Sequence, residues 1–348
     1  MRAFFCLLAL ACASLACRAA PPAYAPFETL RADVARRVAA NDFEGLLQEA
    51  ERFQKSQERL PDGRWKLSTF YRGLREGLTS AAHGEAGWAR EKAALAALAA
   101  AHPNSSNAWL MLATASAGQG WAVRGNGLAP TVSDADQARF VALLEEARQV
   151  LYRHQALLAS NPQSYVLRII IGAGAGDSPA ELDTTFAKAL RAAPDYQQVW
   201  FTRFNYLQPQ WGGSIEQMTA LVVRSTQYPS AADGTGLTAR LLSYAADMGH
   251  PNLARQPGVD WAAVKRSYDD VLDRFPVDYN AESFVLQACG KVDKAETAHL
   301  IARIGHAMSP ADLGDDARLY GLCADWAAGK VPAFYQQDYD TGQKILIQ

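Results

Sequence analysis

Residues 161–200 read NPQSYVLRIIIGAGAGDSPAELDTTFAKALRAAPDYQQVW, two apolar stretches separated by a glycine-rich corner and followed by a second proline corner. The run Ser178-Pro179-Ala180-Glu181 is a helix start: serine caps free amides, proline needs no amide at the first helical position, and glutamate closes a capping box. Pro162 and Pro194 mark corners, because proline cannot continue a helix and keeps the residue before it out of helical conformation. The stretch predicts a pair of helices with a turn at each end.

The same kind of corner, a proline followed by an aromatic residue that opens the next helix, recurs along the chain. It is found at His102-Pro103 before Trp109, Asn161-Pro162 before Tyr165, Ala193-Pro194 before Tyr196 and Trp200, and Phe275-Pro276 before Tyr279. From Pro162 to Pro194 is 32 residues and from Pro194 to Pro229 is 35, close to the period of about 34 of tetratricopeptide repeats. Wider intervals elsewhere make the repeat degenerate. We therefore predict an all-α fold, an antiparallel helix-hairpin solenoid with tetratricopeptide-like repeats.

Other segments agree with this prediction. Phe43 begins an apolar stripe at helical spacing behind Asn41 and Asp42, which are capping residues, and Ser133 precedes a longer stripe. Ser214-Ile215-Glu216-Gln217 and Ser309-Pro310-Ala311-Asp312 are further helix starts. We divide the mature chain into an N-terminal helical unit, 27–130, and a tetratricopeptide-like unit, 131–348.

The first residues do not resemble the rest of the fold. Arg2 precedes an apolar run from Ala3 to Ala16, which is too short for a membrane span and is typical of a secretory signal peptide. We expect cleavage after Ala19, so that 1–19 is a signal peptide and the mature protein is periplasmic or secreted. The alternative is lipidation of Cys17, which would make the protein a membrane-anchored lipoprotein.

Charge and hydropathy argue against a nucleic-acid-binding surface and against a transmembrane helix after the signal region. The chain has 34 Lys and Arg against 36 Asp and Glu, and its isoelectric point is near 6.3, so a basic surface for nucleic acid is not expected. No later segment is long and apolar enough for a transmembrane helix. Cys289 and Cys323 remain after the signal region. They form either a disulfide or two buried free thiols.

No catalytic signature of a metalloprotease, nucleotide-binding loop or serine hydrolase is present, and no cofactor is predicted. His299 and His306 share a helical face, but no further ligand is placed to complete a metal site with them. The glycine-rich run 172–176 lacks the preceding strand and the lysine of a phosphate-binding loop. The hypothesis of an enzyme therefore rests on carboxylates alone: Asp177, Glu181 or Asp183 acting on cell-envelope glycan or peptide.

Three groups stand out as candidate binding residues. Trp121 and Arg124 lie among glycines at the end of a helix, and Trp211 and Gly212 lie in a tight turn before another. Trp65, with Lys66 and Arg72 on the following helix, is the third. Tryptophan and arginine often anchor recognition surfaces. The alternative is structural, with the rings plugging helix corners and the arginine bonding to carbonyls at a helix end.

The same residues carry a family resemblance. The motif Trp121-Ala-Val-Arg124-Gly125, the turn Pro209-x-Trp211-Gly212-Gly213-Ser214 and the pair Ala288-Cys289 resemble those of an uncharacterised bacterial family of exported proteins, known only as a domain of unknown function. Further matching positions are Phe140, Ala147, Leu151, Pro194, Tyr196, Trp261, Lys265 and Asn280. The similarity covers about residues 40 to 305. It implies a helical, tetratricopeptide-like fold and carries no reaction with it. The small-residue ladder of the tetratricopeptide consensus is only partly present.

We therefore expect an exported helical scaffold that binds a protein or peptide partner and is not an enzyme. A cell-envelope hydrolase that uses carboxylates is the alternative. A purely structural role for the tryptophan and glycine motifs is the third hypothesis.

Overall fold

The computed structural model describes residues 25–82, 84–125, 127, 131–306, 308, 313, 316–337 and 344–348. The predicted signal peptide 1–19, including Cys17, and the predicted helix start at 309–312 lie outside the described residues. The described residues are mainly helical, so the predicted all-α class is confirmed. None of the helices in these ranges is both long and apolar enough to cross a bilayer.

The helices are α1 (Ala25–Ala39), α2 (Phe43–Ser56), α3 (Lys66–Ala81), α4 (Gly84–Ala101), α5 (Ser106–Arg124), α6 (Asp134–Arg153), α7 (Gln155–Leu158), α8 (Pro162–Ala175), α9 (Pro179–Ala192), α10 (Gln197–Asn205), α11 (Ile215–Ser225), α12 (Leu237–Asp247), α13 (Trp261–Arg274), α14 (Asp278–Gly290), α15 (Lys294–Ile304) and α17 (Ala317–Ala327). Two 3-10 turns, η3 (Pro209–Trp211) and η4 (Leu253–Arg255), lie between them.

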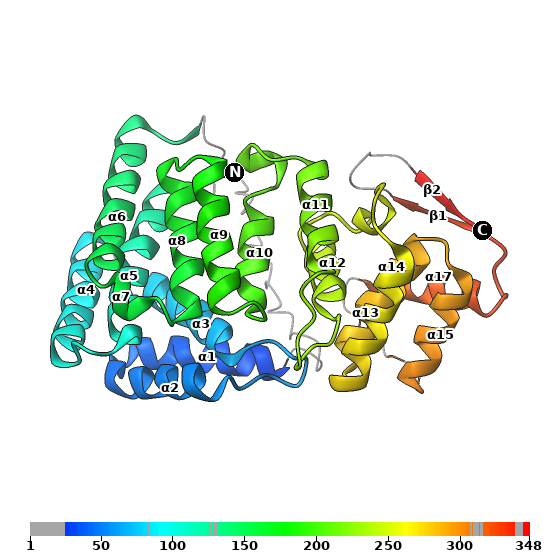
Figure 1. Cartoon of the computed structure of the whole chain (residues 1–348), viewed down its shortest axis with the longest axis horizontal. Coiled ribbons are helices and arrows are strands. Elements are labelled where there is room, and N and C mark those ends of the chain that lie inside the picture. Colours follow the sequence, from blue (N-terminus) through cyan, green and yellow to red (C-terminus); the bar gives the residue numbers. More distant parts are fainter. Residues whose placement is uncertain are drawn as a thin grey trace, which may run out of the picture.

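Helices α8 to α15 follow one another along the long axis of the molecule (Figure 1). Helices α8, α10, α12 and α14 contact one another in succession and form one layer, and α9, α11, α13 and α15 pack against members of that layer. This arrangement hides one apolar face of each helix against its neighbours. The finer assignment to tetratricopeptide-type repeats stays a prediction.

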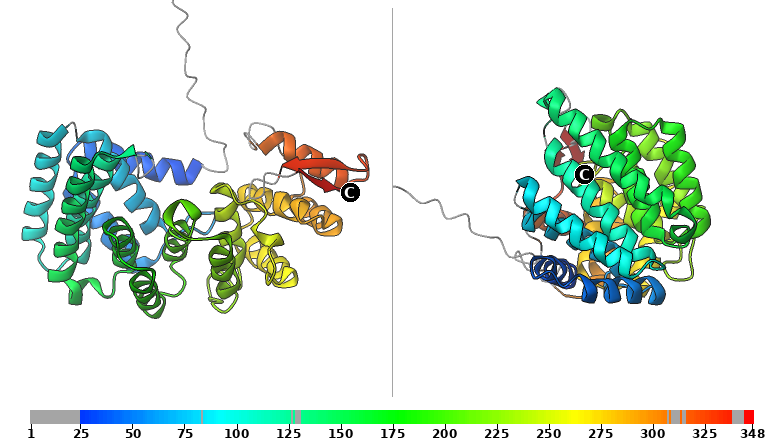
Figure 2. Two further views of the ribbon diagram at one scale, coloured as in Figure 1. Left: turned by 90° about the horizontal axis from the view of Figure 1, so that it is seen from above. Right: turned by 90° about the vertical axis from the view of Figure 1, so that its left-hand side faces the viewer.

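Helices α1 and α2 lie lengthwise along this row, crosswise to its individual helices (Figure 1). Seen from above, the row is curved and α1 lies on its inner side (Figure 2). Helices α1 and α3 pack closely because glycines replace larger residues: a Cβ at Gly73 would lie 2.6 Å from the carbonyl oxygen of Arg31, and one at Gly77 would lie 2.8 Å from the Cα of Ala35. Because α1 and α3 pack so closely, α3 lies beside α1 on the inner side of the row.

The aromatic residues at the proline corners share one contact. The indole nitrogen of Trp109 donates to the carbonyl of Pro103 at 3.0 Å, and that of Trp200 donates to the carbonyl of Pro194 at 3.3 Å. The hydroxyl of Tyr165 donates to the carbonyl of Ala159 at 3.0 Å. In each pair the ring stands six residues after the carbonyl, so it satisfies a backbone oxygen of the turn that connects the two helices.

The predicted helix starts that fall in the described residues are confirmed. Ser178 and Glu181 form a capping box, and the hydroxyl of Ser214 accepts from the amide of Gln217. Asp42 caps α2 by accepting from the amide of Gly45, whereas Asn41 takes a left-handed conformation with φ 57°.

The core is continuous. Buried apolar residues from Val34 to Ile347 form one cluster, and α5 and α6 pack along each other across the predicted unit boundary at residue 130. The division into units 27–130 and 131–348 thus stays a prediction. Cys289 on α14 and Cys323 on α17 form a disulfide, which decides between the two states left open for these cysteines.

A short β-hairpin near the C-terminus was missed by the sequence analysis. Strands β1 (Phe334–Gln337) and β2 (Lys344–Ile347) pair antiparallel, with Phe334 opposite Ile347. Each strand has only four residues, which is too short for an alternating pattern to stand out from a helical one.

Candidate functional site

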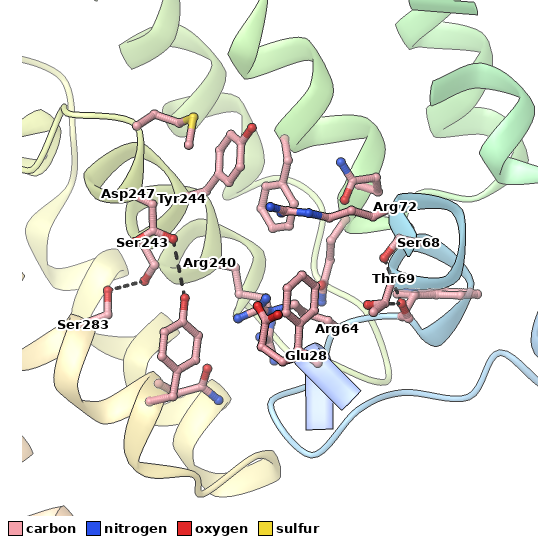
Figure 3. A pocket seen from close by; sticks show the side chains of 18 of the residues that line it. Glu28, Arg64, Ser68, Thr69, Arg72, Arg240, Ser243, Tyr244, Asp247 and Ser283 are labelled. Carbon is pink, nitrogen blue, oxygen red and sulfur yellow. Dashed lines mark hydrogen bonds between the residues drawn. The ribbon is translucent and has the colours of Figure 1, made fainter. Parts of the chain in front are cut away.

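A cleft of about 320 Å³ opens where α1 and α3 meet α10, α12 and α14. Figure 3 shows side chains from all sides converging on it. Its walls combine aromatic rings with many polar side chains, and they are lined by Phe27, Glu28, Arg64, Trp65, Ser68, Thr69, Arg72, Gln197, Gln198, Phe201, Arg240, Ser243, Tyr244, Asp247, Met248, Tyr279, Asn280, Ser283 and Phe284. This mixture suits a ligand with both apolar and hydrogen-bonding groups.

A buried ionic network holds the floor of the cleft. The Asp233 carboxylate accepts from Nη1 of Arg59 at 2.9 Å, from Nε of Arg240 at 3.2 Å and from the amide of Gln197 at 2.9 Å. Arg240 also donates to the carbonyl of Asp62 at 2.6 Å. Burial lowers the pKa of Arg240, and the negative charge of Asp233 opposes that change. The network therefore joins the turn before α3 to α10 and α12 and fixes the width of the cleft.

Trp65, a predicted binding residue, belongs to this wall. Its side chain is 2% exposed, its indole nitrogen donates to the carbonyl of Asp195 at 3.1 Å, and its ring meets that of Tyr196 edge-on at 5.1 Å. Arg59 lies over its face at 5.0 Å. Trp65 is thus held on most sides by the protein itself, and only a small part of it faces the cleft.

Asp247 lies at the rim of the cleft, and the pKa of its carboxylate is raised. The hydroxyl of Tyr279 lies 3.5 Å from its Oδ2 (Figure 3). The surrounding protein raises the pKa of Asp247 to about 6, against the opposing charge of Arg64 and with the help of Asp316. Asp247 is also open to solvent, so water tempers this effect.

Hydroxyl and amide groups line the side of the cleft between α12 and α14. The hydroxyl of Ser283 donates to that of Ser243 at 2.8 Å, and the side-chain amide of Gln287 donates to both. Buried Tyr268 donates to Gln287 at 3.0 Å and so orients that amide. Ser243 and Ser283 line the cleft, and their hydroxyl protons are already donated, that of Ser243 to the carbonyl of Ala239 and that of Ser283 to Ser243, so what they offer to a ligand is acceptor oxygens.

The predicted residues Trp121, Arg124 and Trp211 lie together at another point of the molecule. The rings of Trp121 and Trp211 meet edge-on with centroids 5.7 Å apart, and the Arg124 guanidinium lies 5.6 Å from each centroid. Tyr206 adds its ring 5.1 Å from that of Trp211. We call Trp121, Arg124, Tyr206 and Trp211 the tryptophan cluster.

A second cavity, of about 130 Å³, lies beside this cluster. Trp211, Gly212 and Tyr206 all line it, with Asp177 and Arg203. Gly212 follows the 3-10 turn η3 with φ 81°, a conformation that favours glycine. Gly212 thus shapes the turn that carries Trp211, and the structure places both on the same small cavity.

Arg75 is an exposed arginine on α3. It stands one turn after the cleft residue Arg72 on α3, and its charge acts on Tyr244 of the cleft and on Tyr206 of the cluster. The protein around it lowers the pKa of Arg75, although its side chain is open to solvent.

The sequence analysis missed most of these residues. Arg75, Tyr244, Asp247 and Tyr279 stand on three helices separated by up to two hundred positions, in amphipathic patterns that look ordinary. Arg72 was noted beside Trp65, whereas the neighbouring aromatic residues Phe70 and Tyr71 on α3 are core residues. The spacing of Trp65, Ser68, Thr69 and Arg72 was the available signal, since it places polar side chains beside a tryptophan on one face at the start of α3.

The carboxylates of the hydrolase hypothesis have structural partners. Asp177 pairs with Arg148 at 2.8 Å, Asp183 pairs with Arg203 at 2.9 Å, and Glu181 closes the capping box with Ser178.

The two histidines considered for a metal bind separate aspartates, His299 with Asp269 and His306 with Asp278. Across the described ranges no group of His, Cys, Asp and Glu is arranged to hold a metal ion.

The chain matches no protein-family model, no curated protein and no solved structure. The family resemblance drawn from the sequence therefore stays a prediction.

Proposed function

We propose that this is an exported binding protein that holds a peptide, or an extended segment of a partner protein, on the inner face formed by α3, α10, α12 and α14. The observation that carries the proposal is the cleft itself. It brings aromatic rings such as Tyr244 and Phe201 together with uncharged polar side chains such as Ser243, Gln198 and Asn280. Side chains of this kind suit the alternating apolar and polar groups of a polypeptide.

Export is part of the proposal. The apolar run from Ala3 to Ala16 is typical of a signal peptide, and the Cys289–Cys323 disulfide suits an oxidising compartment. Cleavage after Ala19 and lipidation of Cys17 give different mature N-termini, which mass spectrometry of the purified mature protein distinguishes.

Site-specific photo-crosslinking tests peptide binding. A photoreactive amino acid is placed in the cleft at Ser68 or Gln198, and, as the control, at exposed Lys188 on α9. Irradiation of living cells is expected to give protease-sensitive adducts of defined mass from the cleft positions alone. Adducts that form equally at Lys188, or their complete absence from the cleft positions, contradict the proposal.

The hydrolase alternative gains no specific support from the geometry, because Asp177, Glu181 and Asp183 are engaged as described above.

A further inference from the structure

A third cavity, which we call the Glu91 cavity, lies at the far ends of α1 and α3. The cleft is lined by the first turns of these helices, at Phe27 on α1 and Ser68 on α3. The Glu91 cavity, of about 360 Å³, is lined by their last turns and by the first half of α4, the helix at the end of the molecule opposite the β-hairpin (Figure 1). Its lining residues are Ala35, Ala39, Asn41, Gly77, Ser80, Ala81, Arg90 and Glu91, and among the described residues none lines both this cavity and the cleft.

Glu91 places a carboxylate in the apolar stripe of α4. Trp88 lies about one turn before it and Leu95 one turn after it, and both belong to the core. The Glu91 side chain is 2% exposed. Its Oε1 accepts from Arg90 at 3.1 Å, whereas its Oε2 is buried and has no hydrogen-bond partner within the described ranges. A buried carboxylate is unfavourable unless donors satisfy it, and Arg90 supplies only one, from a side chain that is 62% exposed and screened by water.

The ends of α1 and α3 add negative potential to the same cavity. The two helices run in the same direction, because the start of each lines the cleft and the end of each lines the Glu91 cavity. Ala39 and Ala81, the last residues of α1 and α3, are both part of the lining. Carbonyl groups at the C-terminal end of a helix carry partial negative charge and favour a cation there. Two helix ends and a buried carboxylate therefore act in the same sense.

The remaining walls are made of small side chains. Ala35, Ala39 and Ala81 offer only methyl groups, and Gly77 offers none, since a Cβ there would lie 2.8 Å from the Cα of Ala35. Ser80 adds a hydroxyl that has no hydrogen bond in the part of the chain that the structure describes. Walls of this kind suit a narrow chain of methylene groups, whose apolar surface they remove from water.

We infer that the Glu91 cavity binds a primary ammonium group on an unbranched alkyl chain, with the ammonium paired to the Glu91 carboxylate and the chain against the alanine walls. The bond from ammonium to carboxylate is charge-assisted and therefore stronger than a neutral one. An ammonium has three donors, so it also reaches further acceptors such as the hydroxyl of Ser80. A free alkylamine and the side chain of a lysine both carry this group. The inference is independent of peptide binding in the cleft.

Titration of the purified mature protein with pentylammonium chloride, followed by NMR, tests this inference. The ionic strength is held constant with potassium chloride, so that general attraction between charges does not contribute. We expect saturable binding of pentylammonium and much weaker binding of 1-pentanol, which has the same chain without the charge. Absence of saturable binding at millimolar concentrations, or equal binding of 1-pentanol, overturns the inference and leaves the proposed function standing.

Glu91→Gln keeps the size of the side chain and removes its charge. It is expected to weaken pentylammonium binding about tenfold or more, because a charge-assisted bond is replaced by a neutral one. Glu51→Gln removes the same charge from an exposed position on α2 and is the matched control. Equal losses in the two variants, or no loss in Glu91→Gln, overturn the assignment.

A second variant tests the cavity without touching the carboxylate. Ala39→Leu adds bulk to an exposed residue of the lining and is expected to weaken binding, whereas Ala40→Leu adds the same bulk next to it, outside the lining. Melting temperatures near that of the wild type show that both variants fold. Binding that Ala39→Leu leaves unchanged, or that both variants weaken equally, contradicts the location.

Two further probes separate the sources of the ammonium group. Pentane-1,5-diamine represents a free amine, and Nα-acetyl-lysine methylamide represents lysine within a polypeptide. The tighter ligand of the two identifies the source, and either order supports an ammonium site. Acetylation of the lysine probe at Nζ removes its charge and is expected to abolish its binding. If the acetylated probe binds as tightly as its parent, the inference is wrong.

Discussion

Cys289 on α14 is joined to Cys323 on α17 by a disulfide, and both side chains are fully buried. The bond closes a loop of 34 residues near the C-terminal end of the row of helices. It ties α17, and with it the segment that leads to the β-hairpin, to the layer that lines the cleft.

Removal of this disulfide is expected to destabilise the protein. In the chain-entropy model, a loop of this length contributes about 3–4 kcal/mol to the free energy of unfolding. We expect Cys289→Ala with Cys323→Ala to lose about this amount in urea denaturation, and reductant to lower the stability of the wild type but not of the variant. Free thiols at both positions in the denatured, unreduced wild type would contradict the prediction.

The corner hydrogen bonds make a smaller, separate prediction. Tyr165→Phe removes only the hydroxyl that donates to Ala159, so we expect a loss of about 0.5–1 kcal/mol in the free energy of unfolding. Tyr152→Phe is the control, because Tyr152 is 64% exposed and its hydroxyl has no hydrogen bond in the described structure. If both variants lose the same stability, the corner contact contributes nothing of its own.

The two glycines after Trp211 are expected to differ sharply. A Cβ at Gly213 would lie 2.0 Å from the carbonyl oxygen of Leu207, a backbone atom that moves only if the turn rearranges. A Cβ at Gly212 meets nothing within 4 Å, and its only penalty is φ 81°, about 1 kcal/mol. Gly213→Ala should therefore lower the melting temperature far more than Gly212→Ala. Equal effects would show that the turn adapts more easily than its geometry indicates.

Substitution in the buried ionic network around Asp233 is expected to destabilise the protein more than any of the substitutions above. Asp233→Asn removes the carboxylate charge that pairs with both Arg59 and Arg240, of which Arg240 is buried and Arg59 partly buried. Loss of one partner of a buried ion pair typically costs about 3–5 kcal/mol. We expect a loss of this size in chemical denaturation, and a weaker effect from Asp195→Asn, whose carboxylate is more exposed and pairs with Arg59 alone.

The sequence analysis predicted correctly the features that depend on interactions between residues close together in the chain. Caps such as Ser178 and corners such as Pro194 depend on residues within a few positions, so both were predicted correctly. Trp121 and Trp211 were chosen separately because glycines surround them, and the fold brings them into contact. The cleft could not be predicted in this way. Arg72, Tyr244 and Asp247 line one cleft only because α1 and α3 pack beside α10, α12 and α14, and that packing joins segments far apart in the sequence.

Asp247 leads to a prediction about pH. Its pKa is about 6 in the folded protein, above the ordinary value of 3.8 expected in the unfolded chain. Between about pH 4 and pH 6 the folded state keeps a proton that the unfolded state has lost, so this group makes stability fall as pH rises through that window. Asp247→Asn removes the ionisation and keeps an oxygen for the hydroxyl of Tyr279. We therefore expect the variant to melt at a higher temperature than the wild type at about pH 8, and the difference to shrink towards about pH 4. The effect is expected to be small, because solvent reaches Asp247.

Ser243→Ala, on the same helix and without a titrating group, should change the melting temperature equally at every pH. A constant difference for Asp247→Asn as well, or a lower melting temperature at about pH 8, would mean that Arg64 and Tyr279 stabilise the charged carboxylate more than the surrounding protein opposes it.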